Sequence, residues 1–227
     1  MAETAAQRST IGAAEDFARQ AHDGQVRKGA AQEPYAQHLA EVAMLTRAFG
    51  GATQTVAAAW LHDTVEDCGI APAELERRFG AAVAALAAEL TDDRTLDKAA
   101  RKRRQVETAP HKSDQACLIK LADKTSNLRA LAMSPPAGWD RARRQAYLLW
   151  GVEVVAGLAH RPAAALETFL DAVDAAERAT AWAGLSPAQA EAVEADVALR
   201  EARRAEQGPE AVLAVLAERA RAHGAGG

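Results

Sequence analysis

The stretch LHDTVED, residues 61–67, places one histidine and three acidic residues directly behind the alanine-rich segment VAAAW. Gly69 follows closely, so the pattern predicts a helix over residues 53–67 that ends within this stretch. Carboxylates are unfavourable at the C-terminus of a helix, because unpaired backbone carbonyls already place partial negative charge there. The stretch therefore indicates a compensating positive charge nearby, and a bound divalent cation would supply it.

The composition favours an all-α, multi-helix fold. The chain has 227 residues, enough for one substantial core or for one domain with an appendage. Alanine is abundant and aromatic residues make up only 4%, which favours helix over strand. The segment DGQVRKGAAQEPY contains two glycines and a proline, so it interrupts the helical pattern and is compatible with a short β-hairpin near residues 25–36.

Apolar spacing and breaker residues predict helices along most of the chain. The predicted helices cover residues 11–22, 38–49, 53–67, 72–79, 81–90, 97–107, 113–131 and 139–159. Beyond residue 161 helix signals persist but residues that could carry chemistry become scarce, so we predict a functional domain over residues 1–161 and a helical extension over 162–227. Apolar stripes that include Val197 and Leu213 predict that this extension packs on the domain or on a second copy in a homodimer.

Composition also limits where the protein acts and on what. Cys68 and Cys117 form neither a disulfide framework nor a closely spaced metal pair, which is typical of a reducing cytoplasm. The N-terminus lacks the apolar core of a signal peptide, and the run AAVAALAA is too short to cross a bilayer, so we expect a soluble cytoplasmic protein without membrane contacts. The net charge of −4 argues against a nucleic-acid partner.

Two further segments offer ligands for a cation bound beside residues 61–67. His38 lies at a predicted helix start in PYAQHLAEV, and Asp123 and Asn127 lie one turn apart in LADKTSNLRAL. Together with His62 and Asp63, these residues give a mixed nitrogen and oxygen set without thiolate. Such a set suits Mn²⁺, with Zn²⁺ or Fe²⁺ as alternatives.

The order of the motifs carries a family resemblance. The segments RKGAAQEPYAQH, LHDTVED, LTDDRTLDKAARKRRQVETAPH and LIKLADKTSNLRAL follow one another with spacing that closely resembles the HD-domain hydrolase of the RelA/SpoT homologue superfamily. The resemblance is greatest to the stand-alone small alarmone hydrolases, including those of the metazoan type. It covers about residues 13–159.

The resemblance implies an all-helical HD-domain bundle that removes the 3′-pyrophosphate from guanosine tetra- and pentaphosphate with Mn²⁺. It implies four metal ligands, namely His38, His62, Asp63 and Asp123. It implies two catalytic acids, Glu66 and Asp67. It implies contacts to the substrate or the attacking water from Arg27, Lys28 and Asn127, and contacts to the phosphates from Lys98 and Lys102.

The chain departs from the family pattern beside two of these motifs. Leu39 follows the first histidine where relatives commonly have proline, and Thr125 and Ser126 stand where many relatives have larger residues. Alternatives remain for the function. The same residues would serve another HD phosphohydrolase, such as a nucleotidase or an NADPH 2′-phosphatase, and a non-catalytic nucleotide-binding protein is a third interpretation.

Individual residues also have simpler interpretations. Asp123 can pair with Lys120 or Arg129 within its own helix. Arg27 and Lys28 can be ordinary surface charges, and the basic run around Lys102 can be a solvated helix face. The metal and phosphate interpretations therefore depend on these segments meeting in the fold.

Overall fold

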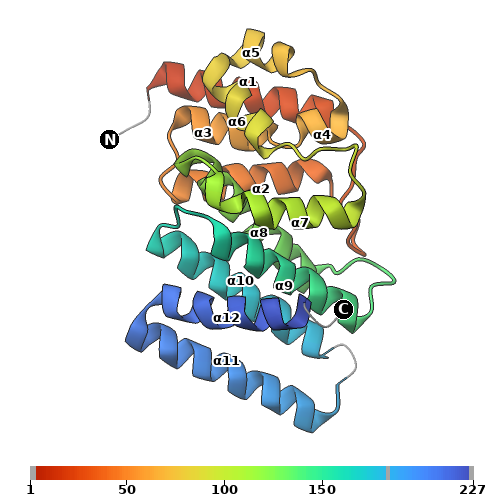
Figure 1. Cartoon of the computed structure of the whole chain (residues 1–227). Helices are drawn as coiled ribbons and strands as arrows, with labels where there is room; N and C mark the ends of the chain where they lie inside the picture. The colour runs from red at the N-terminus through yellow and green to blue at the C-terminus, as the bar shows by residue number, and fades with distance from the viewer. Residues whose placement is uncertain (1–3, 183–184, 225–227) are drawn as a thin grey trace.

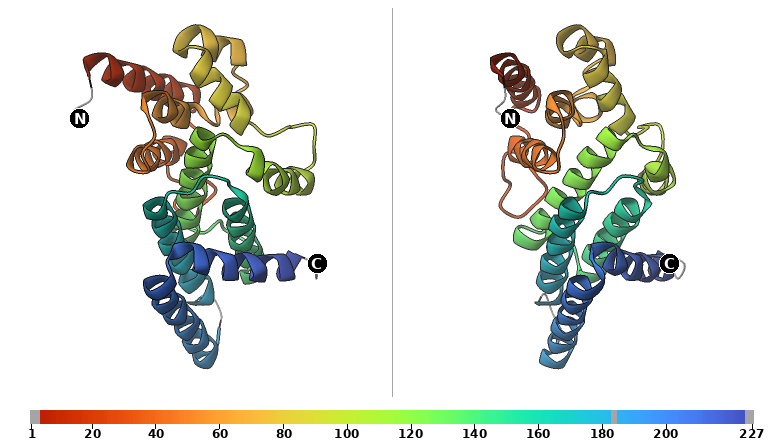
Figure 2. Two further views of the ribbon diagram at one scale, coloured as in Figure 1. Left: turned by 60° about the vertical axis from the view of Figure 1, so that its left-hand side comes forward. Right: turned by 90° about the vertical axis from the view of Figure 1, so that its left-hand side faces the viewer.

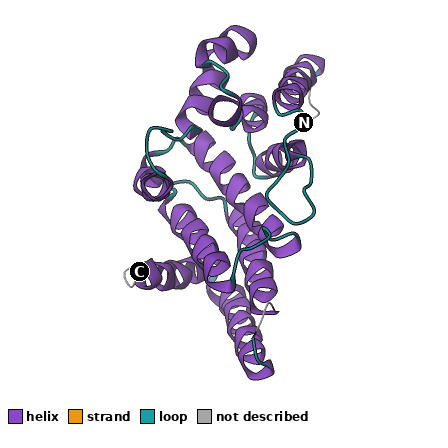
Figure 3. Ribbon diagram, turned by 90° about the vertical axis from the view of Figure 1, so that its right-hand side faces the viewer, coloured by secondary structure: helices purple, strands orange, loops and turns teal. Residues whose placement is uncertain are grey.

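The computed structural model describes residues 4–182 and 185–224, and within these residues the chain is helical without a β-strand (Figures 1 and 3). The all-α prediction is confirmed. The helices are α1 (Ala5–Ala21), α2 (Tyr35–Ala48), α3 (Thr53–Leu61), α4 (Thr64–Cys68), α5 (Pro72–Phe79), α6 (Ala81–Leu90), α7 (Lys98–Thr108), the 3₁₀ turn η1 (Ala109–His111), α8 (Asp114–Met133), α9 (Arg141–Gly157), α10 (Ala163–Trp182), α11 (Pro187–Gln207) and α12 (Pro209–Gly224).

Helix α8 lies at the centre of the arrangement (Figure 2). It packs against α10 on one side and against α2, α3, α6 and α9 around the rest of its surface. Every residue from Ala116 to Ser126 is buried, so this helix is surrounded by protein over most of its length. A helix buried in this way is apolar on all sides except where a polar side chain has a hydrogen-bond or ionic partner. The buried polar side chains of α8 therefore mark the candidate site.

Helix ends follow the predicted proline and glycine signals. Pro72 occupies the first turn of α5, and Gly80, with φ of 86°, separates α5 from α6. Gly69 ends α4 in the left-handed conformation, with φ of 68°. Glycine reaches such positive φ values without the steric cost that a side chain would add, so these two glycines stop helices as expected.

The predicted helix over residues 53–67 is wrong in one respect, because it breaks at His62 and Asp63 into α3 and α4. The Nδ1 of His62 donates to the carbonyl of Ala59 at 2.8 Å, and the hydroxyl of Thr64 donates to the carbonyl of Leu61 at 2.7 Å. These side chains replace the backbone N–H groups that would bind the same carbonyls in a continuous helix. Glu66 and Asp67 consequently lie in the first turn of the short α4 instead of at the end of a long helix.

The loop before α2 folds back on itself, but the predicted hairpin is reduced to an isolated antiparallel bridge between Val26 and Pro34. The amide of Arg27 donates to the carbonyl of Glu33 at 2.8 Å. A second bridge joins Gly29 to Pro136, just after α8. A Cβ atom on Gly29 would lie 2.4 Å from the carbonyl oxygen of Ser134, so only glycine allows this close approach.

The C-terminal helices pack within the chain. Helix α10 lies along α8, α12 lies on α9, and α11 contacts α10 and α12. The predicted stripe residues Val197 and Leu213 are buried in these contacts, as is Leu216 on the same helix as Leu213. The stripes therefore pack on the body of the protein, while a homodimer stays a prediction. No helix in the described ranges is long and apolar enough to span a membrane.

Candidate active site

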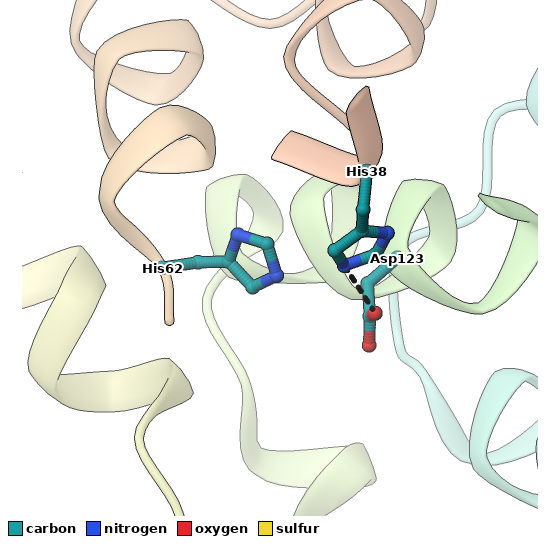
Figure 4. Close-up of side chains that lie close together, drawn as sticks. All are labelled: His38, His62 and Asp123. Atoms are coloured by element: carbon teal, nitrogen blue, oxygen red, sulfur yellow. Dashed lines mark ion pairs between the residues drawn. The ribbon is translucent and has the colours of Figure 1, made fainter. Parts of the chain in front are cut away.

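Three segments that are far apart in sequence bring metal-binding side chains together (Figure 4). His38 comes from the first turns of α2, His62 from the break after α3, and Asp123 from the middle of α8. All three are buried, and one ligand atom from each lies within 4.8 Å of the others. Two imidazoles and a carboxylate at this separation form a site that suits a divalent cation.

Asp63 lies beside this group. Its Oδ2 is 3.0 Å from Nε2 of His62 and 3.7 Å from Nε2 of His38. The hydroxyl of Tyr35 donates to the same Oδ2 at 2.6 Å and so fixes the carboxylate. Sequence reasoning missed Tyr35. Its position one turn before His38 at the start of the same helix is the signal that could have identified it.

The hydrogen bonding of His62 orients one of its ring nitrogens for binding a cation. Since Nδ1 donates to the carbonyl of Ala59, the lone pair of the neutral imidazole is on Nε2. This Nε2 is buried, and in the neutral ring no described residue donates a hydrogen bond to it; Oδ2 of Asp63, 3.0 Å away, is itself an acceptor. A buried nitrogen lone pair that faces carboxylates and receives no hydrogen bond is the arrangement that a metal ligand needs.

The charges of the group are strongly coupled. Burial alone would lower the pKa of His62, but the Asp63 carboxylate outweighs burial and raises this pKa to about 8. Burial would raise the pKa of Asp63, yet His62 and His38 hold it well below its usual range. For His38, burial prevails and lowers the pKa. The carboxylates of this group are therefore stabilised by positive charge beside them. A bound metal ion would supply that charge in place of the histidine protons.

Asp123 is held by neighbours on its own helix. Its Oδ2 lies 3.1 Å from Nζ of Lys124, and its Oδ1 accepts a hydrogen bond of 2.6 Å from Asn127. Burial would raise the pKa of Asp123, but Lys124 and Lys120 lower it well below the ordinary value. Asp123 thus forms an ion pair within its own helix, but with Lys124 instead of the Lys120 or Arg129 that the sequence suggested. This pair leaves the carboxylate facing the two histidines.

Glu66 and Asp67 lie on the wall of the adjoining cavity. The Oε2 of Glu66 accepts a hydrogen bond of 3.3 Å from the amide of Asp92, and the Arg94 side chain donates to the carbonyl of Glu66. Partial burial and the nearby Asp92 carboxylate raise the pKa of Glu66. Partial burial and Asp63 likewise raise the pKa of Asp67. Raised values bring carboxyl groups closer to the neutral pH at which proton transfer is useful.

The cavity beside the histidines has a volume of about 570 Å³, which is large enough for a nucleotide-sized ligand. Its wall includes most of the predicted site residues, namely Arg27, Lys28, His38, Asp63, Glu66, Asp67, Lys98, Asp123 and Asn127. The Arg27 guanidinium donates to Asn127 Oδ1 at 3.2 Å and to Ser126 Oγ at 3.3 Å, so the loop before α2 meets α8 at the cavity.

Lys102 does not line this cavity. Its Nζ lies 4.6 Å from the ring centre of Trp150 and 5.1 Å from that of Tyr147, both on α9. Partial burial and the neighbouring Lys98 and Lys124 lower the pKa of Lys102 to about 8. Lys98 and Lys102 are four residues apart and share one face of α7, but the structure brings only Lys98 to the cavity wall, while the Lys102 ammonium lies against the rings of α9.

Comparison with known proteins gives consistent results. The HD domain family model matches residues 14–164. The guanosine-3′,5′-bis(diphosphate) 3′-pyrophosphohydrolase MESH1 of Mus musculus is 48% identical over 147 residues, which cover 64% of this chain and 82% of the relative. The protein of the same name from Drosophila melanogaster is 41% identical over 139 residues, with 60% and 78% covered.

Solved structures extend the comparison to the fold. A metazoan ortholog of SpoT that hydrolyzes ppGpp and plays a role in starvation responses matches with a TM-score of 0.69 at 34% identity, covering 76% of this chain and 96% of that one. The lmo0812 protein of Listeria monocytogenes matches with a TM-score of 0.52 at 26% identity, covering 64% and 97%. An HD domain implies a divalent metal, in agreement with the buried histidine and aspartate group. The chain belongs to the HD domain family, together with the metazoan SpoT homologues.

Proposed function

We propose that the protein hydrolyses the 3′-pyrophosphate of guanosine alarmones in a Mn²⁺-dependent reaction, converting ppGpp to GDP and pppGpp to GTP with release of pyrophosphate. The observation that carries this proposal is the convergence of His38, His62 and Asp123 within 4.8 Å, at one side of a cavity with basic residues in its wall. The 48% identity to a ppGpp pyrophosphohydrolase supports the substrate.

The metal would be held by the two histidines together with Asp63 and Asp123. When bound, a divalent metal offsets phosphate charge and lowers the pKa of a water molecule to a value near neutrality. Nitrogen and carboxylate ligands without thiolate favour Mn²⁺, with Zn²⁺ or Fe²⁺ as alternatives. Asn127 holds Asp123 by donating to its Oδ1, which directs the other oxygen toward Lys124.

Glu66 and Asp67 would accept and donate the protons that are transferred during the hydrolysis. One of these carboxylates accepts a proton from the attacking water, whose oxygen forms the new bond to phosphorus. The bond between phosphorus and the 3′-oxygen of the ribose then breaks, and that oxygen takes up a proton to become the 3′-hydroxyl. Raised pKa values suit both directions of transfer, because a carboxyl group can then receive and return a proton near neutral pH.

Cationic side chains would hold the phosphates. The net charge of −4 gives no overall attraction for an anion, so local cations must provide it. Arg27, Lys28 and Lys98 line the cavity, and the planar guanidinium of Arg27 can bind two phosphate oxygens at once. We place this machinery in a hydrolase domain over residues 1–161, with 162–227 as a helical extension.

Product analysis tests the proposed reaction. Purified protein with Mn²⁺ and ppGpp is expected to give GDP and pyrophosphate in equal amounts, while protein treated with a chelator gives neither. Release of orthophosphate from NADPH in the absence of any reaction with ppGpp would favour the alternative of an NADPH 2′-phosphatase. Binding of ppGpp without turnover would favour a nucleotide-binding protein.

Replacement of Arg27 tests the phosphate contact. Arg27→Ala is expected to raise the KM for ppGpp by on the order of tenfold or more, since a charged hydrogen bond to phosphate contributes about 1.5–3 kcal/mol. Arg27→Lys should restore only part of the loss, because lysine lacks the bidentate fork. Steady-state kinetics with metal analysis is the measurement. An unchanged KM at full metal occupancy would make this loop a simple connector.

Lys98 and Lys102 form a matched pair on α7. Lys98→Met is expected to raise KM, because Lys98 lines the cavity, whereas Lys102→Met should leave KM close to the wild-type value. Lys102 contacts Tyr147 and Trp150, so its replacement should change the intrinsic tryptophan fluorescence. Equal increases in KM for both variants would contradict this division of roles.

A further inference from the structure

The buried hydroxyl of Ser126 lies among three polar groups. It is 2.9 Å from Nδ1 of His38, 2.6 Å from Oε2 of Glu41 and 3.3 Å from Nη1 of Arg27. Ser126 is fully buried on α8 and faces α2, from which both His38 and Glu41 come. A hydroxyl has one hydrogen to donate and two lone pairs to accept with, so three partners use all of its capacity.

The chemistry of these partners decides the direction of each hydrogen bond. A carboxylate only accepts, so the hydrogen of Ser126 must point to Glu41. A guanidinium only donates, so Arg27 uses one lone pair of the serine oxygen. The remaining lone pair faces His38, whose Nδ1 must therefore carry a hydrogen, whether the ring is neutral or charged.

The position of Glu41 is itself fixed. Its other oxygen, Oε1, accepts a hydrogen bond of 3.0 Å from Nη1 of Arg129. This ion pair keeps Glu41 as a carboxylate with Oε2 toward Ser126. Donation thus runs from His38 through Ser126 to Glu41, and the donation from Arg129 also ends on Glu41.

We propose that Ser126 and Glu41 are positioning residues that set the tautomer of His38, with hydrogen on Nδ1 and the lone pair on Nε2. This Nε2 lies 3.6 Å from Oδ1 of Asp123 and 3.7 Å from Oδ2 of Asp63, on the side where the proposed metal would bind. Ligating histidines commonly have their tautomer fixed in this way by the partner of the second ring nitrogen. The inference rests on the proposed function only for the metal, since the tautomer is a property of the metal-free protein.

Glu41→Gln should reverse the donation from His38 to Ser126. Arg129 only donates, so it would bind the carbonyl oxygen of the new amide and leave the amide nitrogen facing Ser126. That nitrogen would donate to the serine oxygen, and the serine hydrogen would turn to Nδ1 of His38. The hydrogen of the imidazole would then be on Nε2, where it opposes metal binding.

The tautomer can be read from the ¹⁵N chemical shifts of the histidine rings in the metal-free protein, measured at alkaline pH where the rings are neutral. The chain has only six histidines, which makes assignment by substitution practical. We expect hydrogen on Nδ1 of His38 in the wild type and in Ser126→Thr, on Nε2 in Glu41→Gln, and a mixture in Ser126→Ala. Glu206→Gln, an equal change of charge on the exposed surface of α11, is the control and should match the wild type.

Metal affinity gives the second measurement. Competition with a coloured chelator should show Mn²⁺ binding weakened by about 10- to 100-fold in Glu41→Gln and Ser126→Ala, the range typical of lost partners to metal-ligating histidines. Ser126→Thr should bind Mn²⁺ nearly as the wild type does. The proposal is overturned if His38 keeps its hydrogen on Nδ1 in both Glu41→Gln and Ser126→Ala. If the tautomer changes as expected but wild-type protein binds no metal, the metal assignment fails while the positioning role stands.

Discussion

Asp123→Ala is expected to empty the metal site and reduce ppGpp hydrolysis to background. The variant removes one of three ligand atoms that lie within 4.8 Å of one another, and the remaining ligands give a weaker and incomplete set. It also removes the carboxylate beside the buried Lys124 and near Lys120. Loss of one member of a buried ion pair costs about 3–5 kcal/mol, so the free energy of unfolding should fall as well.

Two measurements separate these effects. Metal content after dialysis against Mn²⁺ reports on the site, and urea unfolding of the metal-free protein reports on the ion pair. Asp123→Asn keeps the shape and an acceptor for Asn127, so it should fold better than Asp123→Ala but still lose metal. Asp114→Asn, on the exposed first turn of the same helix, is the control. Full Mn²⁺ occupancy in Asp123→Ala would remove this residue from the site.

Glu66→Gln and Asp67→Asn are expected to lower turnover by about a hundredfold or more, while ppGpp binding and metal content persist. Both variants preserve shape but remove the basic oxygen, and a positioned general base contributes about 10²–10⁴ to rate. The measurement is kcat together with equilibrium binding of ppGpp. Glu76→Gln, an exposed position on α5, should behave as the wild type. Unchanged kcat in both site variants would leave the proposed acids without a catalytic role.

The pH dependence identifies which carboxylate is the base. Since the pKa values of Glu66 and Asp67 are raised, kcat should fall on acidification at a higher pH than the ordinary pKa of the residue that acts, ~4.3 for an exposed glutamate or ~3.9 for an exposed aspartate. A base must be deprotonated to act, so activity is present above its pKa and lost as pH falls through it. The variant that removes the base should lose this acidic limb, and the other variant should keep it at reduced amplitude.

The sequence predicted well where several helices begin and end, because these positions depend on neighbouring residues alone. Pro72, Gly69 and Gly80 restrict or release backbone angles wherever they occur, and the ends of α4, α5 and α6 follow them. The break at His62 was not predictable in the same way. Apolar residues continue through α3 without a proline or glycine, and the interruption comes from side chains of His62 and Thr64 that bind backbone carbonyls.

The candidate site shows a similar division. The residues that chain order and family resemblance identified do meet, with His38, His62 and Asp123 together in one buried group. The polar partners of this group could not be read from the sequence, because they depend on how α2 faces α8. Ser126 illustrates the point, since its small side chain departs from the family pattern and its three hydrogen bonds reach across to α2 and the preceding loop. The sequence also could not separate Lys98 from Lys102, because a basic run does not indicate which of its members lines a cavity.

The burial of α8 has a consequence for how the site moves. Amide hydrogens in a helix that is covered from Ala116 to Ser126 can exchange with solvent only when much of the surrounding structure opens, so those of α8 should be among the slowest to exchange. The loop that carries Arg27 and Lys28 is held by isolated bridges and should exchange by small local openings. Asp123 and Ser126 would therefore remain fixed while the loop opens, which moves Arg27 away from the cavity, and closes again. Adjustment to substrates of different shape would then occur on one side of the cavity only.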